Sequence, residues 1–525
     1  MTSSLGYAEK LSYRADVGTV GMPELFDSTK DLQSKIEELA DLISSSRHLV
    51  VFTGAGISTS CGIPDFRGPK GIWTLQHEGK PMPKIEMPFD QARPGITHMA
   101  LYELQQAGIL KFVISQNIDG LHLRSGIVRS QLAELHGNCF REVCSSCEKE
   151  YFRDFEVETL GCKPTGRRCT EHNCGGKLVD TIVDWEDALP PSELKAAEKH
   201  TKKADLVLCL GTSLQITPAC NLPLKTVRAG GKMVIVNLQA TPKDKSAHLL
   251  IRGKVDEVIS GVMSRLHRRI PPYVHIDRIL LSYYYYWTKK KSVKWYFRIS
   301  SIHGQKLDLP FIKSIEVTFP GRPEFKPATF AKPPCLVRRE TMRLTELDVA
   351  IKLHFADGCM CTTGEILQTL TFEKSKKDQK KTEKVDTVGA LVSLRLRAVE
   401  EGITGLPTLI RAQPFPDTSN GSITEYGVVT KIINHAPAVP EATKEEQATK
   451  EEQTTKDDQP TKEERATKEE QATKEEQATK EEQATEEEQA NKEEQKQEAA
   501  IPVTTKRETP SKVVQKKAPK RRRRT

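Results

Sequence analysis

Four short apolar runs in the first half of the chain constrain its fold more than any other feature of the sequence. They lie at 48–52, 111–115, 205–210 and 232–237, and stretches compatible with helix separate them. A further stretch, 31–46, comes before the first run and has apolar residues at helical spacing. Short apolar runs that alternate with helices are typical of a parallel sheet covered by helices. We therefore expect an α/β fold built on a Rossmann-like parallel sheet.

Polar clusters follow all four apolar runs. They read TGAGIS (53–58), QNIDGLH (116–122), GTSL (211–214) and NLQ (237–239). Ligands of open parallel sheets bind outside the carboxyl ends of the strands. The clusters therefore predict a ligand site along this edge of the sheet.

A glycine-rich turn, Gly54-Ala55-Gly56, comes directly after the first apolar run. Glycines let backbone N–H groups approach a pyrophosphate, and the amino end of a following helix favours its negative charge. The next glycine, Gly62, comes later than the usual dinucleotide spacing requires. Taken alone, the turn is compatible with a dinucleotide site and with an ordinary tight turn.

Two close cysteine pairs, separated by 21 residues, predict a metal site. The four expected ligands are Cys144, Cys147, Cys169 and Cys174. Four thiolates in two close pairs suit a closed, structural zinc ion. Cys139, Cys162 and His172 are spare candidates nearby, and His172 is an alternative to Cys169. The competing interpretation is a coincidental group of buried thiols.

A change of pattern after Pro271-Pro272 indicates a second folded region. Apolar and polar residues alternate over 293–299, 315–319, 349–355 and 392–398. Period-two alternation between connections rich in Pro, Gly and Lys predicts strands of a small β-sandwich. We expect a β-rich domain over 275–435 that serves interaction or stability, because it holds no catalytic constellation.

The end of the chain is strongly charged and repetitive. Residues 443–495 repeat the unit TKEEQA without an apolar stripe, which predicts disorder or a solvated single helix. Residues 441–500 hold 21 acidic and 10 basic residues, and residues 501–525 hold 1 acidic and 10 basic residues. The basic cluster 516–524 predicts nuclear import, with DNA or chromatin binding and a simple solvated tail as alternatives.

Nothing in the sequence predicts a membrane partner. The longest run of apolar and aromatic residues, Ile279 to Trp287, has nine residues and includes Ser282. A membrane-spanning helix needs about 20. The first 18 residues lack the apolar stretch of a secretory signal. We expect a soluble intracellular protein.

The motifs taken together resemble the sirtuins, a family of NAD-dependent protein deacylases. The matching segments are GAGIS (54–58), GIPDFRG (62–68), QNIDGLH (116–122), HGN (136–138), the four cysteines, GTSL (211–214) and VNLQ (236–239). The resemblance covers about residues 45–265 and is greatest to the nuclear sirtuin-6 branch. The opening segment 7–27 and the extension after residue 275 are similar to a plant member of that branch. The second cysteine pair is tighter than in the mammalian protein, so we expect a short zinc loop.

The resemblance implies a role for many single residues. His136 would be the general base, and Asn117 and Asp119 would act beside the nicotinamide ribose. The implied NAD-binding residues are Gly54, Ala55, Gly56, Thr59, Phe66, Arg67, Trp73, Gln116, Gly211, Thr212, Ser213, Asn237, Gln239 and Val255. Trp185 would help to hold the acyl-lysine peptide. The implied catalytic domain spans 31–270, after an N-terminal segment 1–30, with a zinc lobe at about 139–180.

The function that the resemblance implies is NAD-dependent deacetylation of protein lysines in chromatin, with histone tails as the expected substrate. The products would be deacylated lysine, nicotinamide and O-acetyl-ADP-ribose, and the location would be the nucleus. Two alternatives use the same cleft: a protein mono-ADP-ribosyltransferase and a long-chain deacylase. A third alternative is an inactive chromatin-binding scaffold.

Overall fold

The computed structural model describes residues 4–12, 14, 16–82, 87–342, 344–373, 386–415 and 420–435, which belong to one compact unit, Met1–Pro437. The predicted acidic repeats (441–500) and basic tail (501–525) lie outside the described residues. None of the helices within the described ranges is long and apolar enough to cross a membrane. The predicted domain boundaries remain predictions.

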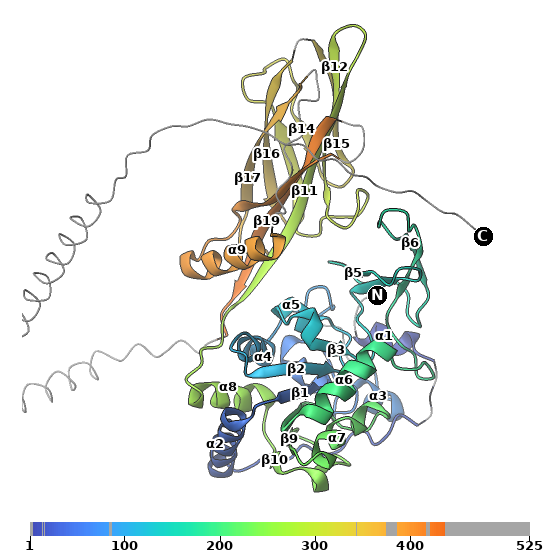
Figure 1. Ribbon diagram of the computed structural model, residues 1–525, viewed down its shortest axis with the longest axis vertical. Helices are drawn as coiled ribbons and strands as arrows, with labels where there is room; N and C mark the ends of the chain where they lie inside the picture. The colour runs from blue at the N-terminus through green and yellow to red at the C-terminus, as the bar shows by residue number, and fades with distance from the viewer. Residues whose placement is uncertain are drawn as a thin grey trace, which may run out of the picture. The chain divides into compact units, whose positions relative to one another are not determined.

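A six-stranded parallel sheet forms the centre of the first half of the chain (Figure 1). Its order is β10 (Leu249–Ile251), β9 (Lys232–Val236), β8 (Leu206–Leu210), β1 (Leu49–Thr53), β2 (Leu110–Ser115) and β3 (Leu132–Glu134). Neighbouring strands pair in parallel throughout. The four apolar runs are β1, β2, β8 and β9, so the predicted Rossmann-like sheet is confirmed.

Helices cover both faces of this sheet. On one face, Leu49 and Val51 share a core with α2 (Thr29–Ser45), α4 (Ile96–Gln106) and α8 (Val255–Arg265). On the other face, Val50 and Phe52 share a second core with α6 (Pro191–Lys203) and α7 (Pro223–Arg228). Every residue of β1 is therefore buried, which explains its continuous apolar sequence. The shorter helices are α1 (Ser4–Lys10), α3 (Ile72–His77) and α5 (Leu121–Ser125).

A small antiparallel sheet carries the cysteine pairs. Its strands, in the order β5 (Glu150–Phe152), β4 (Arg141–Cys144), β7 (Lys177–Asp180) and β6 (Pro164–Arg168), follow β3 in the sequence. The buried Glu142 of β4 holds this lobe together through ion pairs to Arg153 (2.6 Å) and Arg167 (2.7 Å). A buried carboxylate with two guanidinium partners is well compensated for its lost hydration.

Two antiparallel sheets form the β-rich region. The five-stranded sheet has the order β15 (Cys335–Met342), β12 (Ser292–Ser301), β11 (Tyr273–Trp287), β19 (Asn420–Ile433) and β18 (Pro407–Pro414). The four-stranded sheet has the order β14 (Ala328–Phe330), β13 (Ile312–Thr318), β16 (Glu346–Phe355) and β17 (Thr363–Thr371). Alternate residues of both sheets, such as Trp295, Phe297, Val317 and Ile351, form one core. The predicted β-sandwich is confirmed.

One predicted strand is wrong. Residues 392–398 lie in the helix α9 (Thr387–Glu401) and not in a strand. The Asp386 side chain caps its amino end by accepting from Val388 N at 3.1 Å, and Gly402 ends it at a φ of 67°. Leu394 and Ala398, four residues apart, face the sheet. The apolar residues of this segment fit both the alternation of a strand and the spacing of a helix. The two capping residues favour the helix.

We expect Trp295→Ala to destabilise the sandwich strongly. The Trp295 side chain is fully buried, and its Nε1 donates to Thr341 Oγ1 at 3.2 Å. Removal of a buried aromatic ring costs about 3–5 kcal/mol. The matched control is Leu367→Ala on β17, because that side chain is 66% exposed and should change the free energy of unfolding by less than about 0.5 kcal/mol. Urea unfolding of both variants measures this, and equal effects would contradict the sandwich core.

Candidate active site and metal centre

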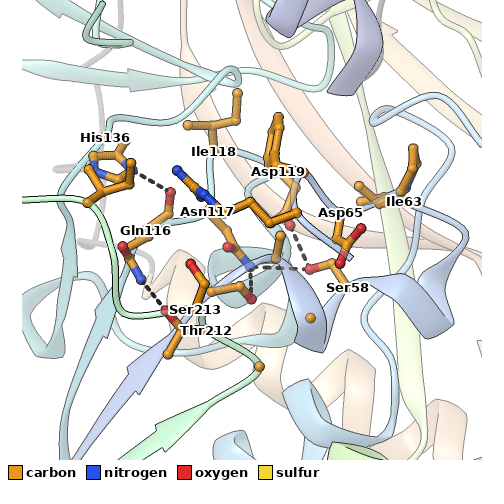
Figure 2. A pocket seen from close by; sticks show the side chains of 18 of the residues that line it. Ser58, Ile63, Asp65, Gln116, Asn117, Ile118, Asp119, His136, Thr212 and Ser213 are labelled. Carbon is orange, nitrogen blue, oxygen red and sulfur yellow. Dashed lines mark hydrogen bonds between the residues drawn. The ribbon is translucent and has the colours of Figure 1, made fainter. Parts of the chain in front are cut away.

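A cleft of about 940 Å³, partly open to solvent, lies at the carboxyl ends of the parallel strands (Figure 2). Its walls come from the glycine turn after β1, the segment Gln116–Asp119 after β2, and His136 after β3. The segment Gly211–Ser213 after β8 and the residues after β9 complete it. The cleft lies where the four polar clusters predicted a ligand site.

Most of the predicted site residues meet in this cleft. Fifteen of them line it: Gly54, Ala55, Gly56, Phe66, Arg67, Trp73, Gln116, Asn117, Asp119, His136, Gly211, Thr212, Ser213, Asn237 and Gln239. Thr59, Trp185 and Val255 are not among the lining residues. Thr59 is exposed and donates to Gly56 O, and Val255 packs in the core at the start of α8. Trp185 lies 5.0 Å from Trp73, ring to ring. Their individual roles stay predictions.

Several lining residues were not predicted. They are Tyr7, Ser58, Ile63, Pro64, Asp65, Phe89, Ile118 and Ile216. Ser58 and Asp65 stand inside the matching segments 54–58 and 62–68, which was the available signal. No local pattern marks Tyr7, which reaches the cleft from the N-terminal helix α1 and packs edge-on against Phe66 at 6.1 Å.

The glycine turn is shaped by a close crossing of two loops. Gly56 N donates to Gly211 O at 2.9 Å, and Gly54 N donates to Leu210 O at 3.1 Å. A Cβ at Gly56 would lie 2.7 Å from the Cα of Gly211. Gly211 itself has a φ of 56°, a conformation that favours glycine. The glycines therefore permit the loop after β1 and the loop after β8 to touch and form one wall of the cleft.

We expect Gly56→Ala to lower the affinity for NAD at least tenfold and to reduce stability. The added methyl group would meet the backbone of Gly211, and this backbone cannot move aside as a flexible side chain can. Isothermal titration with NAD and thermal melting measure the two effects. The matched control is Gly79→Ala, because a Cβ there would meet nothing within 4 Å. Gly79 has a φ of 63°, a backbone cost for alanine that Gly56 does not share, so this control should reduce stability but leave the affinity for NAD unchanged. Equal effects of both substitutions on NAD affinity would contradict this prediction.

A chain of hydrogen bonds fixes the polar side chains at the floor of the cleft. Asn117 Nδ2 donates to Gly54 O at 3.1 Å and to Ser58 Oγ at 3.3 Å (Figure 2). Ser58 Oγ donates to Asp119 Oδ2 at 2.8 Å, and Leu121 N donates to Asp119 Oδ1 at 2.9 Å. Both carboxylate oxygens of Asp119 are thus held, so its negative charge has a fixed position beside Asn117.

His136 is arranged to accept a proton. Its Nδ1 donates to Gln116 O at 2.9 Å, which leaves Nε2 as the basic nitrogen. Burial of the ring lowers the pKa of His136 to about 4, although the bond to Gln116 O opposes this shift. The imidazole is therefore neutral at physiological pH. A neutral, oriented imidazole on the wall of a cleft is suited to general-base catalysis.

Arg67 fits an anionic ligand. Its Nε donates to Val17 O at 2.9 Å, and its guanidinium lies 4.5 Å from the centroid of Trp73. Its buried Nη2 has no hydrogen-bond partner among the described residues. A buried cationic donor without an acceptor is costly unless a ligand supplies one. A pyrophosphate in the cleft would do so, and the residues present thus fit NAD.

The four predicted cysteines form one group whose sulfur atoms all lie within 4.8 Å of one another. The Cys144–Cys174 and Cys147–Cys169 sulfur distances are 3.5 and 3.6 Å. Four thiolates at a Zn–S distance of about 2.3 Å in a tetrahedron lie about 3.8 Å apart. The group therefore fits zinc in a closed coordination shell. The spare candidates Cys139, Cys162 and His172 are not part of it.

Comparisons with known proteins identify relatives of this chain. The Sir2 family model matches residues 82–218. "NAD-dependent protein deacetylase SRT1" of Arabidopsis thaliana is 56% identical over 431 residues, which cover 82% of this chain and 90% of that protein. "NAD-dependent protein deacetylase Sirt6" of Drosophila melanogaster is 48% identical over 277 residues, covering 51% and 87%. The solved structure "Sir2 bound to acetylated peptide" is 36% identical, covers 45% of this chain and 99% of that chain, and has a TM-score of 0.36.

The resemblance predicted from the motifs is thus confirmed. It holds over nearly the whole length of the Arabidopsis protein, including the β-rich region after the parallel sheet. On this identity and coverage, the chain belongs to the Sir2 family of sirtuins.

Proposed function

We propose that this protein is an NAD-dependent protein-lysine deacetylase that acts on acetylated histone tails in the nucleus. The observation that carries the proposal is the neutral His136 imidazole, which shares one cleft with Asn117, Asp119 and the unpaired donor of Arg67. Acetyl-lysine, NAD and water would give lysine, nicotinamide and O-acetyl-ADP-ribose. The dinucleotide supplies the ribose carbon to which the acetyl oxygen becomes bonded.

The residues of the cleft would bind the pyrophosphate, orient the ribose and accept a proton. Arg67 would pair with the pyrophosphate, and the bare glycine turn would leave room for it. Asn117 and Asp119 would orient the ribose, since both are already held by hydrogen bonds. His136 would take a proton from a ribose hydroxyl at Nε2, while Gln116 O keeps the ring in place. Placing both reactants in one cleft supplies much of the rate enhancement.

The acetylated peptide would lie extended between the parallel-sheet domain and the zinc lobe. Trp73 lines the cleft, and Trp185 lies 5.0 Å from it, so the two rings offer an aromatic wall to the lysine stem. Backbone pairing would hold the peptide extended, and contacts to its flanking side chains would select the sequence. The zinc would stabilise the lobe and take no part in the reaction, because all four of its positions would be filled by cysteine.

The test of the substrate compares peptides on the full chain. We expect nicotinamide release with an acetylated histone H3 tail to be at least tenfold faster than with a scrambled acetyl-peptide of equal charge. Equal rates would contradict the histone assignment. A myristoyl peptide as the better substrate would indicate the long-chain deacylase. Labelled ADP-ribose on protein would indicate the transferase, and no nicotinamide release in any arm would indicate the inactive scaffold.

The nuclear location rests on the basic cluster 516–524. We expect a fluorescent fusion of the full chain to accumulate in the nucleus. Replacement of Arg521, Arg522, Arg523 and Arg524 with glutamine should shift it to the cytoplasm, because import signals are recognised by clustered positive charge. Microscopy measures the ratio of nuclear to cytoplasmic signal, and an unchanged ratio would contradict this role of the cluster.

A further inference from the structure

A stacked group of tyrosines lies on the outer face of the five-stranded sheet. In the β11–β12 pair, Tyr284 stands opposite Tyr296, and Tyr286 stands opposite Lys294. Tyr283 and Tyr285, which alternate with these residues along β11, point into the sandwich core, so Tyr284 and Tyr286 point outward. The rings of Tyr284 and Tyr296 stack at 4.5 Å and 5°. Tyr286 lies 6.3 Å from Tyr296 and is 47% exposed.

Basic side chains surround these rings. Arg338 stands opposite Tyr296 on β15, with its guanidinium 5.8 Å from that ring. Arg298 lies two residues beyond Tyr296 on the same face. Neither arginine makes an ion pair with any residue that the structure describes. We call Tyr284, Tyr286, Tyr296, Arg298 and Arg338 the tyrosine face.

The positive charge of this region continues into the adjoining turn. Lys289, Lys290 and Lys291 connect β11 to β12 and are all exposed. They lie at the tip of the β11–β12 hairpin, near the top of Figure 1. Two acidic residues lie near this turn: Glu340 is paired with Lys294 at 3.5 Å, and the backbone of Glu373 contacts Tyr285 and Trp287. A large excess of positive charge thus borders the exposed ring of Tyr286.

Packing of the sandwich core does not explain this arrangement. The core lies on the opposite face of the sheet, and α9 covers the other end of the outer face through Leu394 and Ala398. Cross-strand aromatic pairs stabilise a sheet by up to about 1 kcal/mol. The three adjacent lysines of the turn repel one another instead. A ligand that is both anionic and planar would account for the rings and the charges together.

We propose that the tyrosine face binds single-stranded nucleic acid. Its phosphates would contact Arg298, Arg338 and the lysine turn, and an unpaired base would stack on the exposed ring of Tyr286. Aromatic rings beside a basic surface are the usual means of binding single strands, whose bases are free to stack. This surface is separate from the basic cluster 516–524 and does not depend on the proposed deacetylation.

The acidic repeats of the chain are the competing occupant. Residues 441–500 offer negative charge, with 21 acidic residues against 10 basic ones. They contain no aromatic residue or base that could stack on Tyr286. The acidic repeats would therefore bind through charge alone, whereas a nucleic acid would also stack its bases on the tyrosine rings.

The test measures binding of a fluorescein-labelled oligothymidylate to the full chain at several salt concentrations. The basic cluster is first neutralised by replacing Arg521, Arg522, Arg523 and Arg524 with glutamine, so that it does not mask the tyrosine face. In this background we expect R298Q/R338Q to weaken binding at least tenfold. Two lost phosphate contacts should also lower the slope of log affinity against log salt by about 1.4.

The matched control is K313Q/R322Q. It removes the same charge from exposed residues of the sandwich outside the five-stranded sheet (69% and 45% exposed) and should leave the affinity within twofold. A second variant, Tyr286→Leu, should weaken oligothymidylate binding at least fivefold and leave binding of inorganic polyphosphate unchanged. Unchanged melting temperatures exclude misfolding of either variant.

Two results would overturn the proposal. In the first, R298Q/R338Q and the control bind the oligothymidylate equally. In the second, the arginine variant leaves oligonucleotide binding unchanged but makes residues 441–500 more sensitive to trypsin, which would assign the face to the acidic repeats of the chain.

Discussion

Replacement of His136 with tyrosine should lower the rate of nicotinamide release with an acetyl-peptide by about 10²–10⁴-fold, the range expected for loss of a general base. Tyrosine has no group that is basic near neutral pH. It also cannot reproduce the bond from Nδ1 to Gln116 O. Steady-state assays at saturating NAD measure the loss, and the melting temperature shows whether the variant folds.

The matched control for this variant is His77→Tyr. His77 is exposed at the end of α3 and does not line the cleft. It should keep the activity of the unmodified chain. Activity of the His136 variant equal to that of this control would contradict the assignment of the base.

The lowered pKa of His136 predicts an unusual dependence of kcat/KM on pH. A general base acts in its neutral form, and burial lowers the pKa of His136 to about 4. Protonation should therefore abolish kcat/KM only as the pH falls through about 4. From pH 6 to 8 this group should leave kcat/KM flat, whereas an ordinary histidine would cause a fall below about pH 6.5.

Replacement of Cys147 with serine should remove the zinc and unfold the zinc lobe. Cys147 supplies one of four sulfur atoms, and a structural site binds metal weakly when a thiolate is lost. Because the bound metal contributes directly to folding, the lobe should lose its antiparallel sheet. We expect less than a tenth of the zinc content of the unmodified chain, and little deacetylase activity, because the lobe forms one side of the proposed peptide site.

A neighbouring thiol provides the control for this prediction. Cys162 is exposed in the same lobe and lies outside the four-cysteine group. Cys162→Ser should keep one zinc per chain by elemental analysis and an unchanged melting temperature. If both serine variants retained the same zinc content, the four-cysteine site would be wrong.

The parallel sheet was predictable because burial on both faces removes polar residues from its strands. β1, β2, β8 and β9 each hold at least three consecutive apolar residues for this reason. The sandwich strand β12 was visible for the opposite reason, since Trp295 and Phe297 face the core while Tyr296 faces outward. The strand prediction at 392–398 is wrong because an amphipathic helix can also place apolar residues two apart, and only the caps Asp386 and Gly402 distinguish the two structures.

The candidate site was predictable to the extent that its residues are local in sequence. Asn117 and Asp119 follow one strand, and the resemblance pointed to both. The contact of Tyr7 with Phe66 joins segments that are far apart, so no local pattern reports it. The close approach of Gly56 to Gly211 is likewise a tertiary feature, and it explains the glycine turn better than the phosphate spacing does.

The proposed reaction is tested most directly by its stoichiometry on an acetylated histone peptide, followed by mass spectrometry. We expect one nicotinamide and one O-acetyl-ADP-ribose for each acetyl group lost, and no loss of acetyl groups when NAD is omitted. Deacetylation without NAD, or release of free acetate in place of O-acetyl-ADP-ribose, would contradict it.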